Sequence, residues 1–134
     1  MNNKICIITG ANAGIGKAMA LALAQQGAQI VMVCRNQASG EAAQHEIRRL
    51  SSNPAIELLL ADLSSQASIR ELASQIEAHY PQIHVLVNNA GIDPGGTVVD
   101  IDPKLWQEVM DTNLTGPFLT MKKVIPHMIA NGGG

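Results

Sequence analysis

The chain has 134 residues, 46% of them hydrophobic and 15% charged, and its formal net charge is −2. This length and apolar content suffice for one domain with a buried core. The small negative charge argues against nucleic acid or an anionic membrane surface as a partner. No apolar stretch approaches the length of a bilayer span, and the glycine turn that follows the first short apolar run is not typical of a signal peptide.

Strand-like and helix-like segments alternate along the chain. Strands are predicted at residues 4–9, Gln29–Cys34, 55–60 and 83–87. Helices are predicted at residues 15–26, 39–50, from Ser64 or Ser65 to Pro81, 103–112 and 113–130. Four residues share one face of the first of these helices: Ala18, Leu21, Ala22 and Gln25.

This alternation, with short connections, predicts an α/β protein of the Rossmann type: a doubly wound parallel sheet with helices on both faces. Ligands bind such sheets beyond the carboxyl ends of the strands, where three of the predicted turns meet. Cys6 and Cys34 fall near the start of one strand and the end of the next. We therefore expect reduced core thiols in a cytoplasmic protein.

A glycine-rich turn at residues 9–16 joins the first strand to the first helix. Glycines let the backbone approach a ligand and adopt positive φ, and the start of the helix offers free N–H groups to a pyrophosphate. The alternative is a loop that only packs a helix on a strand. A kinase-type phosphate loop fits poorly, because Lys17 is followed by Ala18 and the magnesium-binding hydroxyl is missing.

The end of the second strand indicates which dinucleotide binds. NAD sites place a carboxylate here for the ribose hydroxyls, whereas NADP sites place a cation for the 2′-phosphate. This chain has Arg35 followed by Asn36, and no Asp or Glu precedes Glu41. Arginine can bind a phosphate with two parallel hydrogen bonds, so NADP is predicted over NAD. A solvated surface arginine is the alternative.

Polar motifs also follow the third and fourth strands. Asp62, followed by Leu63, can accept a hydrogen bond from an adenine amino group or simply begin a turn. At residues 88–91, Asn88 and Asn89 precede Ala90 and Gly91. The small residues permit close approach of a cofactor, and the amides can tie this strand end to its neighbour. An Asx turn is the alternative.

Four segments of the chain resemble, in order and spacing, the motifs of the short-chain dehydrogenase/reductase family. They are the turn at 9–16, Asp62 with Leu63, residues 88–91 and Asn113. The glycine spacing resembles that of its compact oxidoreductase branch. Residues 33–36 are similar to retinol-dehydrogenase-type members, and the region after Gly91 to ketoacyl-reductase-type members. The resemblance implies NAD(P)-dependent hydride transfer to or from a small alcohol or carbonyl substrate.

The candidate cofactor-binding residues are Thr9, Gly10, Asn12, Ala13, Gly14, Ile15, Gly16, Arg35, Asn36, Asp62, Leu63, Asn89, Ala90 and Gly91. For Asn113 the resemblance implies a catalytic role, holding a water in a proton relay through the catalytic lysine. An N-cap of the last helix is the alternative for this residue. Related proteins assemble through that helix, which contains Phe118 and Met121, so a homo-oligomer is expected.

The family's chemistry needs a serine on the next strand and a tyrosine followed four positions later by a lysine. The only tyrosine, Tyr80, has His84 at that position, and the scattered histidines predict no metal site. We therefore expect residues 1–134 to be the NAD(P)-binding part of a longer reductase, truncated before its Ser, Tyr and Lys and inactive alone. The alternative is a non-catalytic nucleotide-binding module or sensor. A transferase with an adenosyl cofactor is disfavoured, because no carboxylate stands near position 35.

Overall fold

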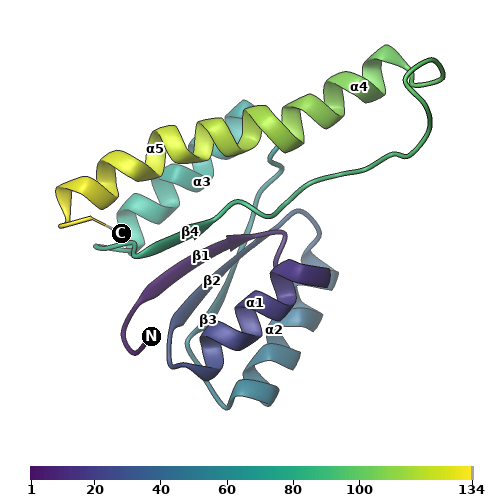
Figure 1. Cartoon of the computed structure of the whole chain (residues 1–134). Coiled ribbons are helices and arrows are strands. Elements are labelled where there is room, and N and C mark those ends of the chain that lie inside the picture. The colour runs from purple at the N-terminus through teal and green to yellow at the C-terminus, as the bar shows by residue number, and fades with distance from the viewer. Residues whose placement is uncertain (134) are drawn as a thin grey trace.

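Four parallel strands form the centre of the molecule in the computed structural model, which describes residues 1–133 (Figure 1). They are β1 (Ile5–Thr9), β2 (Gln29–Cys34), β3 (Ile56–Leu60) and β4 (Val85–Val87). Their order across the sheet is β3-β2-β1-β4. The order reverses at β1, so the carboxyl ends of β1 and β4 flank a topological switch point, as the Rossmann prediction requires.

Helices cover both faces of this sheet. On one face lie α1 (Gly14–Gln25) and α2 (Gln37–Ser51), and on the other α3 (Gln66–His79) and α5 (Gly116–Ala130) (Figure 1). After β4 the chain runs through a long irregular segment to α4 (Pro103–Met110), which extends beyond the sheet (Figure 1). The predicted elements are all present, with ends shifted by a few residues.

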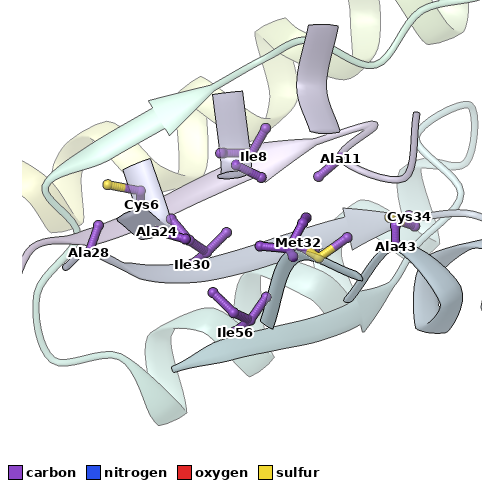
Figure 2. Packing of buried hydrophobic residues seen from close by; sticks show 12 residues of the cluster. Cys6, Ile8, Ala11, Ala24, Ala28, Ile30, Met32, Cys34, Ala43 and Ile56 are labelled. Carbon is purple, nitrogen blue, oxygen red and sulfur yellow. The ribbon is translucent and has the colours of Figure 1, made fainter. Parts of the chain in front are cut away.

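The core has two layers because both sheet faces are covered. Cys6, Ile8, Ile30 and Met32 belong to one buried cluster with Ala24 of α1 and Ala43 of α2 (Figure 2). The alternate residues of the same strands, Ile7, Val31 and Val33, pack with α3 and α5. Aliphatic strands buried on both faces are typical of parallel sheets.

The face of α1 that packs on the sheet is not the face predicted from the sequence. The buried residues are Gly16, Ala20 and Ala24, whereas Ala18, Ala22 and Gln25 are exposed and Leu21 is only partly buried. Their spacing of four places three small residues on one stripe, which lets the helix lie close to the strands. Because α1 is rich in alanine, hydrophobicity alone gives several nearly equivalent faces.

The last two helices are joined without a break, which corrects the predicted boundary between residues 112 and 113. A π-helical segment, η1 (Asp111–Thr115), connects α4 directly to α5. Asn113 lies inside this segment and its side chain caps no helix, so the N-cap alternative is wrong. The glycine turn after α5 is described through Gly133, and Gly134 lies outside the described residues.

Both cysteines are free and buried, and they lie at opposite ends of neighbouring strands, as expected. Burial raises the pKa of the Cys34 thiol, an effect partly offset by hydrogen bonds from the backbone N–H groups of Ala11 and Asn12. Cys34 is therefore a buried thiol that lies next to the glycine turn. Within residues 1–133, no helix is both long enough and apolar enough to cross a lipid bilayer.

Candidate cofactor site

A pocket of about 410 Å³ opens at the carboxyl ends of the strands, over the switch point. Its wall includes these predicted residues: Gly10, Asn12, Ala13, Gly14, Arg35, Asn36, Asp62, Leu63, Asn89, Ala90 and Gly91. Four predicted residues are not in the wall: Thr9, Ile15, Gly16 and Asn113. Sequence reasoning missed five that are: Val33, Cys34, Ala61, Ile92 and Thr112. Four of these five directly adjoin a predicted residue.

The three glycines of the turn have different tasks. Gly10 and Gly14 have φ values of +65° and +52°, the left-handed region that favours glycine. A Cβ at Gly10 would lie 2.9 Å from Cα of Ala90, and one at Gly16 would lie 2.5 Å from the Gly10 carbonyl oxygen. A Cβ at Gly14 would meet nothing within 4 Å. Gly10 and Gly16 therefore permit internal packing, and Gly14 keeps the pocket open.

The start of α1 carries backbone N–H groups that no side chain caps. Its N-cap residue is Ala13, and its first turn contains no acidic residue. By contrast, side chains of Asn36, Ser65 and Asp102 accept hydrogen bonds at the starts of α2, α3 and α4. An uncapped helix start in a pocket wall offers N–H donors and a positive dipole end to an anion.

Thr9 acts behind the pocket wall. Its buried hydroxyl donates to the Val87 carbonyl (3.3 Å) and accepts from the N–H groups of Asn89 (2.9 Å) and Ala90 (3.0 Å). The Asn89 side chain in turn donates to the carbonyl groups of Thr9 (3.0 Å) and Gly10 (3.3 Å). The predicted tie between this strand end and its neighbour is confirmed, and it fixes β4 against the glycine turn.

The cationic side of the pocket is formed by Arg35. Its side chain is exposed and makes no ion pair among residues 1–133, whereas Lys17 is bound to Glu46 at 2.6 Å. Asn36 caps α2 by accepting from the N–H of Ser39 at 2.9 Å. The Asn36 oxygen is thus committed to the helix, and Arg35 is the charge at this end that can meet a ligand.

Asp62, after the neighbouring strand β3, provides an ionised acceptor on the same side of β1 as Arg35. Its Oδ1 accepts from both the hydroxyl (2.7 Å) and the N–H (2.9 Å) of Ser64. These bonds, with a smaller contribution from Arg35, lower the pKa of Asp62 below its ordinary value. Both bonds use Oδ1, so Oδ2 can accept from a ligand amino group.

Asn113 holds the far end of the wall in place. Its Oδ1 accepts from the N–H of Ile92 (2.8 Å), and its Nδ2 donates to the Ile92 carbonyl (2.9 Å). π-helical turns often mark functional sites. This one places Asn113 next to Ile92 and Thr112, which both line the pocket, although Asn113 itself does not. Because both side-chain amide atoms are used, a water-holding role for the Asn113 side chain stays a prediction.

Tyr80 belongs to the core and not to the pocket. Its hydroxyl donates to Glu57 Oε2 at 2.7 Å, and burial together with this carboxylate raises its pKa. A tyrosine with a raised pKa between a helix and a strand is a poor proton donor and acceptor at neutral pH. Among residues 1–133, no three His, Cys, Asp or Glu side chains gather as a metal site.

The sheet order, the glycine turn and the uncapped helix at the switch point define a Rossmann-type fold with a pocket at its switch point. A family model described as short chain dehydrogenase matches residues 4–134. The chain belongs to the short-chain dehydrogenase family.

Comparison with known proteins agrees with this assignment. Human dehydrogenase/reductase SDR family member 13 is 36% identical over 126 residues, which cover 94% of this chain and 32% of that protein. A metagenomic short-chain oxidoreductase in complex with NADP superimposes with a TM-score of 0.92 at 32% identity, covering all of this chain and 60% of that one. A 3-ketoacyl-(acyl-carrier-protein) reductase from Brucella melitensis complexed with NADH superimposes with a TM-score of 0.87 at 31% identity. This match covers 98% of this chain and 52% of that one. Curated relatives are matched over 32% to 57% of their own length.

Proposed function

We propose that this chain supplies the cofactor site of an NAD(P)-dependent oxidoreductase that transfers a hydride between a nicotinamide ring and an alcohol or carbonyl carbon. The uncapped start of α1 in the pocket wall carries the proposal, because its free N–H groups and the open space at Gly14 fit a diphosphate. When bound, the cofactor supplies the hydride acceptor or donor. The chain's own residues bind and orient it.

We infer that NADP(H) is the preferred cofactor. Similar structures hold either NADP or NADH, so family membership alone leaves the choice open. Arg35 favours NADP(H), because it follows β2, lines the pocket and has no ion-pair partner among the described residues. The 2′-phosphate would bind this guanidinium, and the β2–α2 turn has no carboxylate that would repel it.

Titration of the full-length protein with NADPH and NADH tests this proposal. Replacing Arg35 by Ala should weaken NADPH binding by about 10- to 100-fold, since a charge-assisted hydrogen bond contributes about 1.5–3 kcal/mol. NADH affinity should change little. The matched control Arg70→Ala removes an exposed arginine from α3 and should leave both affinities unchanged. Tighter binding of NADH than of NADPH by the unmodified protein would refute the NADP preference.

Turnover is proposed to need a Ser, a Tyr and a Lys that residues 1–134 do not supply, with Asn113 as a further catalytic residue. Tyr80 cannot substitute, because it is buried against Glu57. This observation also favours a second candidate, a nucleotide-binding module or sensor without catalysis. A downstream tyrosine followed four residues later by lysine would decide for the enzyme. Residues 1–134 alone should bind NADPH without turnover.

We further propose that the protein acts in a reducing compartment such as the cytoplasm and assembles with copies of itself. Two buried free thiols support the first point. Self-assembly is supported by the exposed apolar residues that α4, η1 and α5 carry. They are Trp106, Leu114, Phe118, Met121, Ile125 and Ile129. Sedimentation of the full-length protein with and without Phe118→Glu tests the assembly, which the charge should disrupt. A monomer in both cases would refute it.

A further inference from the structure

Thr120 is a buried polar residue that the cofactor pocket does not use directly. Among residues 1–133, Thr9 and Thr120 have buried polar side chains, with 1% and 5% of their surface exposed. Thr9 holds the glycine turn, as described above. Thr120 lies on α5 and is not part of the pocket wall.

The Thr120 hydroxyl bonds across to the end of β4. Oγ1 donates to Oδ1 of Asn88 at 2.8 Å and also lies 3.0 Å from the Pro117 carbonyl oxygen of its own helix. Helical threonines commonly bond only to a carbonyl one turn earlier. Here the hydroxyl also bonds to Asn88, and Thr120 lies beside apolar side chains such as Ile7, Leu72 and Val124, whose low polarity strengthens a hydrogen bond.

The position of Asn88 gives this bond a consequence for the pocket. Asn88 directly precedes Asn89, Ala90, Gly91 and Ile92, which form the pocket wall on the β4 side. β4 has three residues and lies at the edge of the described sheet, so strand pairing holds this wall from one side. Side chains supply the remaining connections, from Thr9, Thr120 and Asn113.

We propose that Thr120 is a positioning residue that holds the β4 side of the pocket for the nicotinamide half of the cofactor. The strand order supports this assignment. Because Arg35 and Asp62 follow β2 and β3 on one side of β1, the adenosine half belongs there. The other half of a dinucleotide must then lie toward β4 and residues 89–92. The inference rests on the proposed function and adds a residue to it.

Comparing a whole cofactor with half of one tests the proposal. In the full-length protein, Thr120→Val keeps the shape of the side chain but removes the hydroxyl. NADPH affinity should fall about 5- to 10-fold, the value of one hydrogen bond, whereas adenosine 2′,5′-bisphosphate, which lacks the nicotinamide half, should bind within twofold of wild type. Thr120→Ser restores the hydroxyl and should restore NADPH affinity. Thr97→Val, in an exposed turn, is the matched control and should change neither affinity.

A second variant tests the same bond from its other end. Asn88→Ala should reproduce the selective loss, and the double variant should be no worse than either single one, because both remove one interaction. Equal weakening of both ligands, additive effects or unchanged NADPH affinity would each overturn the inference while leaving the proposed function standing. Failure of the wild-type protein to bind either ligand would instead overturn the proposed function, and this inference with it.

Discussion

The two halves of the pocket are built in different ways. On the side proposed for the adenosine half of the cofactor, β1 and β2 are almost fully buried, and backbone bonds such as Gly10 N–H to the Val33 carbonyl (2.8 Å) fix the turns. On the opposite side no residue of β4 is fully buried, and hydroxyl and amide side chains fix the wall. The first half therefore depends on space around the backbone, and the second on a few polar side chains.

The largest expected effect tests the role of space on the adenosine side. Gly16→Ala places a methyl group 2.5 Å from the Gly10 carbonyl oxygen and against the Asn89 side chain. Overpacking of this kind costs about 1–3 kcal/mol or more of unfolding free energy, and cofactor binding should be lost. Urea unfolding and NADPH titration of the full-length protein measure both.

Gly14→Ala is the matched control for that experiment. Its methyl group meets open space, and the positive φ of Gly14 costs about 1–2 kcal/mol. This variant should stay folded and still lose most NADPH affinity, because the methyl group enters the pocket. Equal destabilisation by the two substitutions would contradict the distinct roles of the two glycines.

The next largest effect tests the polar side chains of the β4 side. Thr9→Val removes the acceptor for the N–H groups of Asn89 and Ala90. Leaving these partly buried donors unpaired costs about 1–3 kcal/mol, so the melting temperature should fall clearly. Thr9→Ser keeps the hydroxyl and should recover most of the loss. If serine proved as harmful as valine, packing of the methyl group and not hydrogen bonding would hold this wall.

The smallest expected effect concerns the start of β4, the end of the strand that lies away from the pocket. Nδ1 of His84 accepts from the N–H of Ile5 at 3.0 Å, which requires neutral imidazole. Burial, with a smaller contribution from Lys4, lowers the pKa of His84 below 6.5. Since the unfolded chain then takes up a proton at higher pH than the folded protein does, stability should fall as the pH drops below about 6.5.

Unfolding by urea at pH 7.5 and 5.5 checks this dependence. His84→Gln cannot titrate and should reduce the loss of stability at the lower pH. His45→Gln, which replaces an exposed histidine of α2, serves as control and should keep the wild-type dependence. An unchanged pH dependence in His84→Gln would show that this contact does not respond to acid.

The sequence predicts best what depends on local pattern. β2 matches its predicted bounds because its apolar run is continuous and ends at Arg35. The glycine turn and most of the pocket wall were also predictable, since parallel strands bring their carboxyl ends to one edge. The face of α1 was not, because alanines occur on two opposite sides of that helix, and only the packed sheet selects the side of Ala20 and Ala24.

Features that depend on contacts between distant residues could not be predicted. η1 forms where Asn113 meets Ile92, 21 positions earlier, and nothing in its local sequence indicates a π-helix. Gly116 was passed over, although a Cβ there would lie 2.9 Å from the Leu63 carbonyl oxygen, where α5 crosses the turn after β3. Thr120 resembles any helical threonine until its partner Asn88 is known.

A crystal structure of the full-length protein with NADPH tests the central claim most directly. The account predicts the diphosphate at the backbone N–H groups of residues 12–15, the 2′-phosphate at Arg35 and the nicotinamide beside residues 89–92. A cofactor bound elsewhere, or in this pocket with its ends reversed, would contradict the account.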